Sequence, residues 1–427
     1  MGSAAKETLR SLPKMDPGLI EQARREARKI EIPQSAWCKA HGFASEKSYK
    51  ETMAAGGRIM YHTHFCFDSR EAMVREMAAL EKLLAARGLE LDRFGVSLDP
   101  SMALPPAMRR DDAEHHGLYL SKQADWDEVA SFSFSQPHFG DNMIGSPASF
   151  DSCCSALRAG VTTMGNISQF FGWDYPEFPD VEARTRAAVM AIAAMGEHRA
   201  DGAMVHSNLD DGYGDKCADM GQLIAMALLE QYIAEDLLGA KVAHSFGDMF
   251  HSPYKRLVFL SALRMIHKDG VFGSMVFTNK LGRRKEPMDL NDAHLCECML
   301  FDMAGQVHYR TGHAVTVMAD RGLDDQVTNE EIVRKLALAK ELESYLPEVL
   351  KLIDFAAVDA QAAALVERGK RLESSILGYL SNFIDVTDAY SVMLAVKKLG
   401  VKTLMGELSD KTEERGALPT DFLLYSH

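Results

Sequence analysis

The sequence lacks the features that mark several specialised classes of protein. No apolar run reaches the roughly 20 residues that a membrane-spanning helix needs. The basic residues near the N-terminus precede no apolar core of the kind found in secretory signals. Lysine and arginine total 47 against 61 aspartates and glutamates, which gives a net charge of -14. Because nucleic acids and anionic membranes are themselves negatively charged, this balance argues against both as partners.

Cysteine is also scarce, and its pattern argues against a disulfide framework. The seven cysteines include no C-x-x-C pair. An odd number of cysteines without an export signal predicts reduced thiols and a cytoplasmic location. No G-x-G-x-x-G or phosphate-loop motif occurs in a suitable context, which argues against these two nucleotide-binding folds.

Eight short apolar runs recur along the chain, and nearly every one ends at histidine, asparagine or aspartate. Segments with helical periodicity separate most of them; in residues 70–86, for example, apolar residues recur every three or four positions. Strands that alternate with helices indicate βαβ units and a parallel sheet. About eight such units in about 270 residues predict a closed (β/α)8 TIM barrel. The runs are 59–67, 94–98, 129–136, 161–164, 202–205, 241–243, 275–278 and 314–318.

The remaining residues predict helical additions to this barrel. Residues 1–56 read as an N-terminal helical extension, and the glycine pair before the first run ends it. Residues 57–345 form the predicted barrel. Residues 346–427 are rich in alanine and leucine and read as a C-terminal helical appendage.

The polar residues at the strand ends are the candidate site. His62 and His64 lie two apart in one strand, so both side chains point to the same side. In a barrel the carboxyl ends of the strands converge where catalysis takes place, which predicts an enzyme that acts on a small molecule. The catalytic candidates are His62, His64, Asp99, His138, Asn166, Gln169, His206, Asn208 and His244.

One interpretation of these residues is a metal-dependent hydrolase. The H-x-H pair and Gly160-Val161-Thr162-Thr163 resemble stretches of the amidohydrolase superfamily, although Tyr61 stands where an aspartate is usual. Imidazole and carboxylate ligands suit zinc. The alternative metal ligands are His62, His64, His206, His244 and Asp320.

A second resemblance covers residues 43–345. The chain resembles the large, catalytic subunit of adenosylcobalamin-dependent glutamate mutase (methylaspartate mutase). The order and spacing of short sequence segments agree better than the identity of their residues. These segments are Gly160-Val161-Thr162-Thr163, Ile167-Ser168, Leu228-Leu229-Glu230, Gly239-Ala240-Lys241, Ser245-Phe246-Gly247, Val276-Phe277, Gly312-His313-Ala314-Val315 and residues 43–57.

This resemblance implies a radical isomerase of the carbon-skeleton mutase type. An adenosyl radical would remove a hydrogen from the substrate inside the barrel, and the protein would position groups and exclude water. Tyr213, Phe246 and Gly247 are placed to meet a bulky planar cofactor. The full set of cofactor-binding candidates is Gly165, Tyr213, Phe246, Gly247, Asn279, Asn329 and Glu330.

The chain also departs from this family. The family's R-H-G-T-P-D-A segment corresponds to residues 143–149, where the substrate arginine is lost, and a second family arginine falls near Leu104. A dicarboxylate needs fixed cationic groups to offset its burial, so we expect a small polar substrate other than glutamate. The D-x-H-x-x-G signature of the cobalamin carrier is absent, because Glu297 takes the glycine position after Asp292 and His294. The resemblance therefore implies a separate small cobalamin-binding subunit, in a homodimeric or hetero-oligomeric assembly.

Overall fold

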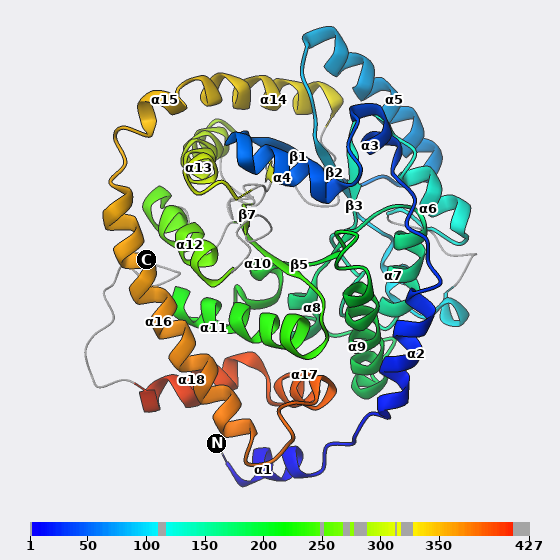
Figure 1. Ribbon diagram of the computed structural model, residues 1–427, viewed down its shortest axis with the longest axis vertical. Coiled ribbons are helices and arrows are strands. Elements are labelled where there is room, and N and C mark those ends of the chain that lie inside the picture. Colours follow the sequence, from blue (N-terminus) through cyan, green and yellow to red (C-terminus); the bar gives the residue numbers. More distant parts are fainter. Residues whose placement is uncertain are drawn as a thin grey trace.

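A computed structural model describes residues 2–109, 117–247, 252–267, 274–276, 288–311, 314–316 and 328–412. Helices surround a set of short strands near the middle of the molecule (Figure 1). The described strands are β1 (Met60–Phe65), β2 (Arg93–Val96), β3 (Gln136–His138), β4 (Thr163–Met164), β5 (Met204–Asn208), β6 (Val242–Phe246), β7 (Ser274–Val276) and β8 (Ala314–Thr316).

Helices connect these strands and extend the chain at both ends. The α-helices are α1 (Ser3–Arg10), α2 (Pro17–Ala27), α3 (Ala36–His41), α4 (Glu46–Gly56), α5 (Arg70–Arg87), α6 (Gln123–Val129), α7 (Ser149–Arg158), α8 (Ile167–Gly172), α9 (Val181–Glu197), α10 (Leu209–Tyr213), α11 (Met220–Gln231), α12 (Pro253–Ile266), α13 (Met288–Tyr309), α14 (Asn329–Ser344), α15 (Leu346–Val349), α16 (Phe355–Leu380), α17 (Ala389–Leu399) and α18 (Val401–Thr412). Two 3-10 helices, η1 (Pro100–Ala103) and η2 (Pro106–Met108), follow β2, and a π-helical segment, η3 (Tyr232–Leu237), continues α11.

Local sequence signals account for the ends of these helices. In α5, the Ser69 hydroxyl accepts a hydrogen bond from the Ala72 amide, and Gly88 ends the helix with φ of 61°. Between these caps, Met73, Met77, Leu80 and Leu84 are buried. The spacing of three or four residues therefore places one apolar face of the helix against the sheet.

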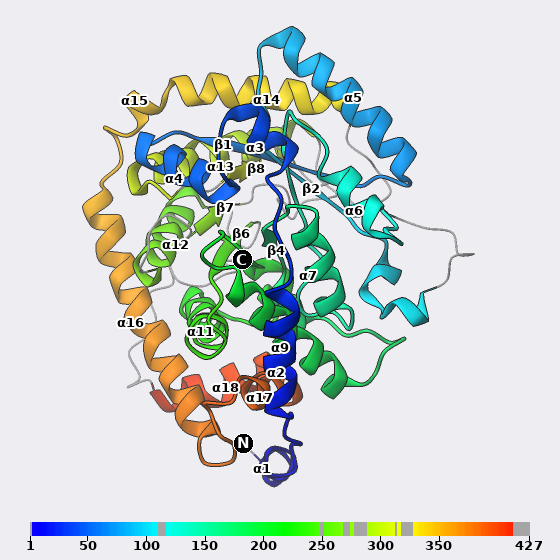
Figure 2. The same cartoon turned by 45° about the vertical axis from the view of Figure 1, so that its right-hand side comes forward.

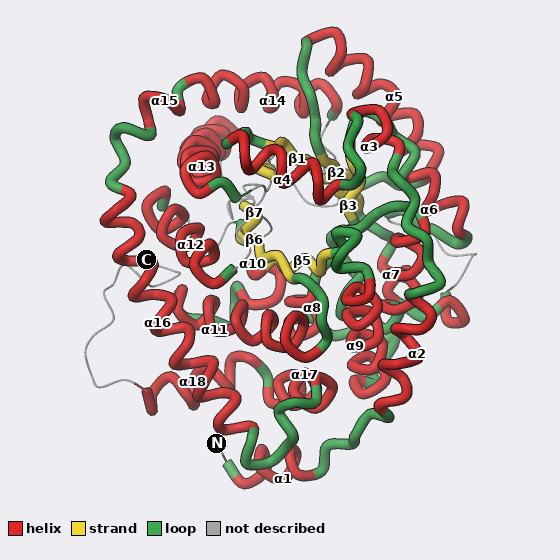
Figure 3. The backbone as a smooth tube through the Cα atoms, viewed as in Figure 1, coloured by secondary structure: helices red, strands yellow, loops and turns green. Residues whose placement is uncertain are grey.

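The strands form a parallel sheet that is not closed. They are hydrogen-bonded in the order β3-β2-β1-β8-β7-β6-β5-β4. Strands β1 to β3 make one three-stranded group and β4 to β6 a second, and the groups do not close into a ring. In Figure 3, β1 to β3 lie on one side of the centre and β5 on the other. The described residues are 62% helical. The prediction of a closed (β/α)8 barrel is therefore wrong.

The opening lies between β3 and β4, and its cause is visible in the sequence. The amide of Gln136 donates to the Asp92 carbonyl on the β2 side at 3.0 Å. Successive backbone amides of a strand point to opposite sides, so the amide of residue 137 would point towards β4. Residue 137 is a proline, which has no N–H to donate. In the described residues, one bridge between Phe139 and Met164 joins the two edges. Of the predicted strand 129–136, only Gln136 belongs to β3, and the residues before it form the end of α6 and a turn.

Helices outside the sheet cover its amino-terminal end and its flanks. Helix α4 lies at the amino-terminal end of the strands, where Tyr49 and Lys50 contact residues next to β2 and in β4. Helix α2 packs along α9, and α16 runs beside α11 and α12 (Figure 2). The inner face of the sheet carries His62, His138 and His206, which are all buried.

Candidate active site

Three histidines from β1, β3 and β5 meet on the inner face of the sheet. His62, His138 and His206 are each 1% exposed. The ring centroids of His62 and His138 are 5.9 Å apart, and those of His138 and His206 are 5.1 Å apart. We call these three residues the histidine cluster. It joins residues that lie far apart in the sequence because alternate residues of a strand share one face.

Two glycines provide the space that the imidazole rings occupy. A Cβ atom at Gly95 would lie 2.5 Å from His64 Nδ1 and 3.2 Å from His62 Nε2. At Gly165 it would lie 2.9 Å from His206 Nδ1. The contacts at 2.5 and 2.9 Å are closer than side chains tolerate, so larger residues at these positions would displace the rings of His64 and His206.

The environment keeps the histidine cluster neutral near neutral pH. Burial lowers the pKa of His62, His138 and His206 well below the usual value, and the positive charge of Arg93 lowers it further. A neutral imidazole carries one donor and one acceptor nitrogen. Each ring therefore has a donor side and an acceptor side.

Hydrogen bonds fix which nitrogen of His138 is the acceptor. His138 Nδ1 lies 3.2 Å from the Thr163 carbonyl oxygen, which only accepts, so Nδ1 carries the proton. The Nε2 atom of His138 is buried and has no hydrogen-bond partner among the described residues. Its lone pair is therefore available on the inner face.

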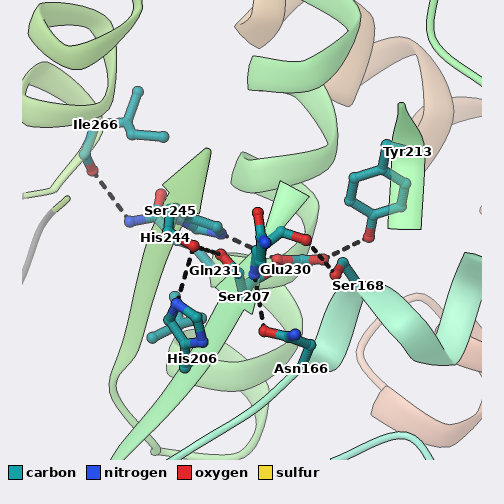
Figure 4. Close-up of polar contacts among 12 residues, drawn as sticks. Asn166, Ser168, His206, Ser207, Tyr213, Glu230, Gln231, His244, Ser245 and Ile266 are labelled. Atoms are coloured by element: carbon teal, nitrogen blue, oxygen red, sulfur yellow. Dashed lines mark hydrogen bonds and ion pairs between the residues drawn. The ribbon is translucent and has the colours of Figure 1, made fainter. Parts of the chain in front are cut away.

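His206 is oriented by β6. Its Nε2 atom lies 2.9 Å from the Ser245 hydroxyl, which donates to the Ser207 carbonyl at 3.3 Å (Figure 4). The hydroxyl then accepts from His206, so Nε2 carries the proton and Nδ1 is the basic nitrogen on the Gly165 side.

Three charged residues lie beneath the histidine cluster at the amino-terminal end of the strands. Glu46 and Lys50 come from α4 and Arg93 from β2, and their exposed fractions are 3%, 1% and 0%. The Lys50 ammonium lies 2.9 Å from the Glu46 carboxylate, and Arg93 Nε lies 3.2 Å from the same oxygen. Burial lowers the pKa of Lys50 to about 8. Burial raises the pKa of Glu46, but Lys50 and Arg93 outweigh it, so the net shift is downward.

A ring of amides and carboxylates lies at the carboxyl-terminal ends of β3, β4 and β5. The Asn166 amide donates to Asp141 at 3.1 Å and to Asp211 at 2.9 Å. Gln169 also donates to Asp141, at 2.7 Å, and the Asn208 backbone amide donates to Asn166 at 2.9 Å. Asn166, Gln169 and Asn208 were all predicted as site residues, and the structure brings them together.

Two other predicted catalytic residues differ in their relation to the histidine cluster, because His64 borders the Gly95 space beside His62 whereas Asp99 lies in the loop after β2. His64 is half-buried, and its Nε2 atom lies 3.0 Å from the Ser97 hydroxyl. Asp99 accepts hydrogen bonds from the amide and hydroxyl of Ser101 and caps η1. Asp99 therefore shapes the loop after β2.

His244 points away from the cluster. It pairs in register with Ser207, whereas Asn208 pairs with Ser245, so His244 occupies the outer face of the sheet. There its Nε2 atom lies 3.0 Å from Glu230 and its Nδ1 atom 2.9 Å from His267 (Figure 4). The prediction that His244 belongs to the same site as His206 is therefore wrong.

The predicted cofactor contacts do not form a surface for a planar cofactor. The fully buried Tyr213 hydroxyl donates to Glu230 on the outer face. Phe246 packs against Phe259 and beneath the Arg256 guanidinium, also on the outer face. The other positions are scattered: Gly165 lies beside His206, the Gly247 carbonyl accepts from Arg256, Asn329 bonds to Glu76, Glu330 is exposed on α14, and Asn279 lies outside the described residues.

The alternative zinc site is not assembled either. His244 faces away from His62 and His206, and Asp320 lies outside the described residues. Within the described ranges, no group of three histidine, cysteine, aspartate or glutamate residues is arranged to hold a metal ion.

Several residues of the site were missed at the level of sequence. These are Glu46, Lys50, Arg93, Gln136 and Asp141. The signal for Arg93 was a charged residue next to a buried apolar strand, because such a residue is rarely buried without a role. Glu46 and Lys50 are spaced four apart on a helix, a pattern that usually marks an exposed pair.

Comparisons with known proteins give the chain no family. No protein-family model matches it, and no curated protein is significantly similar to it in sequence. No helix in the described part is long and apolar enough to cross a membrane. The chemistry of the chain therefore lies in the site itself, in which neutral histidines face buried cations.

Proposed function

We propose that the chain is an enzyme that isomerises a small polar substrate on the inner face of the sheet, where His138 Nε2 exchanges a proton with it. The observation that carries this proposal is the fixed tautomer of His138. Its proton is held by the Thr163 carbonyl, and the opposite nitrogen is a buried acceptor without a hydrogen-bond partner among the described residues. Proton transfer by a positioned imidazole contributes about 10²–10⁴-fold to a reaction rate.

The charges around His138 favour this chemistry when negative charge develops on the substrate. A proton taken up by His138 creates a cation beside Arg93 and Lys50, which is unfavourable by itself. Negative charge on an enolate or alkoxide would offset that repulsion. The same two cations would then stabilise the intermediate electrostatically.

The resemblance to the glutamate mutase large subunit supports the isomerase class and suggests a second route. In that route a separate cobalamin-binding chain would assemble with this one, and the histidine cluster would still bind the substrate. The predicted cofactor contacts do not fit a planar cofactor, because Tyr213 and Phe246 are packed on the outer face. The cysteines, which form no disulfide, support the cytoplasm as the compartment.

The test is hydrogen exchange between substrate and solvent. The full chain is incubated in D₂O with a panel of small hydroxy, keto and amino acids, and proton NMR follows their C–H signals. One arm contains the protein alone, and another adds adenosylcobalamin and a co-expressed small cobalamin-binding subunit. We expect deuterium incorporation or rearranged product in the first arm. Rearrangement without solvent deuterium in the second arm alone would support the cobalamin route.

His138→Asn tests the role of the histidine. The asparagine amide can replace Nδ1 as donor to the Thr163 carbonyl but has no counterpart of Nε2. We expect the rate to fall about 10²–10⁴-fold. The unfolding free energy should change by only about 1 kcal/mol. His41→Asn at an exposed position is the control. An unchanged rate in H138N, or no reaction in either arm, would disprove the proposal.

A further inference from the structure

Three deeply buried arginines differ in how their guanidinium groups are paired. Arg184 donates to four backbone carbonyls, those of Gly145, Gln169, Phe170 and Trp173. Arg256 binds both carboxylate oxygens of Asp302, at 2.8 and 2.6 Å, and also the Gly247 carbonyl. In both cases the protein itself occupies the donors, as expected for a structural arginine.

Arg93 is the exception. It is 0% exposed, yet its two terminal nitrogens have no hydrogen-bond partner among the described residues. Its Nε atom lies 3.2 Å from Glu46 Oε1. Glu46 is also engaged by Lys50 at 2.9 Å and by the Thr163 hydroxyl at 3.1 Å. Because this one carboxylate is shared among three groups, the two terminal nitrogens of Arg93 have no acceptor among the described residues. Burying a cation with unsatisfied donors costs free energy.

The strand next to Arg93 adds one further donor and one acceptor. Gln136 pairs in register with Arg93, and His138 pairs with Gly95, so all three side chains share the inner face. The Gln136 carbonyl oxygen accepts from the Ser35 hydroxyl at 2.6 Å, which fixes the amide orientation. Its Nε2 atom is buried and, like His138 Nε2, has no hydrogen-bond partner in the described part.

We infer that Arg93 and Gln136 bind the carboxylate of a small hydroxy acid whose hydroxyl group donates to His138 Nε2. This inference rests on the proposed function and names its substrate class. A guanidinium fork matches a carboxylate with two parallel hydrogen bonds. Among the described residues the inner face offers one such fork, which suits a monocarboxylate and agrees with the loss of the arginines that a dicarboxylate would require.

The experiment measures binding of three simple probes to the full chain by calorimetry at matched ionic strength. Glycolate carries the carboxylate and the hydroxyl, acetate only the carboxylate, and glycolamide only the hydroxyl. We expect the wild type to bind glycolate most tightly and glycolamide least. Arg93→Met should weaken glycolate and acetate about 10–100-fold, in keeping with hydrogen bonds to a charged group. Arg93→Lys, which keeps the charge but loses the fork, should recover only part of this affinity.

Thermal unfolding separates binding from folding. Arg93→Met removes a poorly paired buried charge and leaves Glu46 bonded to Lys50, so its melting temperature should stay close to that of the wild type. Arg184→Met is the matched control, and should melt several degrees lower because four buried carbonyls lose their donor. A large loss of stability in R93M together with unchanged probe binding in R93K would show that Arg93 is structural and overturn the inference.

His138→Asn distinguishes this inference from the proposed function. It should weaken glycolate but leave acetate unchanged. If glycolate binding depended on Arg93 but were unchanged in H138N, the anion site would stand. His138 would then not be the partner of the hydroxyl group. Failure of the wild type to prefer the carboxylates over glycolamide, or equal binding by R93M, would overturn the anion site itself.

Discussion

Strands β5 and β6 carry two equally buried histidines with very different surroundings. His206 points to the inner face and His244, on the neighbouring strand, to the outer face (Figure 4). On the outer face five polar side chains form one paired network, in which the hydrogen bonds run in one direction. Gln231 donates to His267, His267 to His244, and His244 to Glu230, which also accepts from Tyr213.

The inner face shows the opposite pattern. His138, Gln136 and Arg93 are as deeply buried as the outer network, but each keeps at least one nitrogen without a hydrogen-bond partner in the described residues. Burial and residue type are therefore poor guides to the role of a polar side chain. What separates the two faces is how far the protein itself satisfies the donors and acceptors, because a fully paired group stabilises the fold and an unpaired one is suited to a ligand.

The largest expected effect comes from breaking the outer network. Glu230→Ala leaves the His244 and Tyr213 donors buried without an acceptor and also opens a small cavity. Each unsatisfied donor costs about 1–3 kcal/mol. We therefore expect the unfolding free energy to fall by about 3–5 kcal/mol in total, as measured by urea denaturation.

The matched control for Glu230 is Glu367→Ala, which removes an exposed carboxylate paired with Lys370. It should change the unfolding free energy by less than about 0.5 kcal/mol. If the two variants lost similar stability, the outer network would not be the stabilising element that its hydrogen bonds indicate.

A smaller effect is expected from the far end of the same network. Burial and the Glu230 carboxylate raise the pKa of Tyr213, so its hydroxyl stays protonated and donates. Tyr213→Phe removes this donor to a buried carboxylate and should cost about 2 kcal/mol in unfolding free energy. Tyr345→Phe is the control, because Tyr345 makes the same kind of bond to Glu341 in an exposed position. Equal losses in the two variants would contradict the importance of burial.

Much of the secondary structure was predictable, but the closure of the sheet was not. Apolar runs located β1, β2, β5 and β6 to within a few residues, because buried parallel strands are apolar on both faces. Closure depends on whether β3 can donate to β4, and this is decided by Pro137 and by the shortness of both strands. Pairing between specific strands is a property of three-dimensional register, which apolar periodicity does not encode.

The candidate site was predictable to a similar degree. The histidine cluster was found because polar residues inside or just beyond apolar runs are unusual. His244 was misplaced because the run 241–243 put it at a strand end, whereas β6 continues to Phe246 and His244 lies at its centre. A shift of one residue reverses the face. Arg93 was missed because it precedes the run that marked β2, and its unsatisfied donors become visible only when its neighbours are placed.

The smallest expected effect concerns the pH dependence of the unfolding free energy, and it arises from the lowered pKa of His138 on the inner face. Burial lowers the pKa of His138 in the folded protein, whereas an unfolded histidine titrates near pH 6.5. Below about pH 6.5 the unfolded chain therefore binds a proton that the folded chain excludes, so the unfolding free energy falls as the pH falls. Above that pH neither state is protonated and the contribution is complete.

Replacing His138 by asparagine should reduce this slope by about 1.4 kcal/mol per pH unit between about pH 5 and 6. Urea denaturation at several pH values measures the slope, with His41→Asn as the control for loss of a histidine. A slope in H138N equal to that of the wild type would mean that His138 takes up its proton without unfolding, and the contrast between the two faces of the sheet would then no longer hold for this residue.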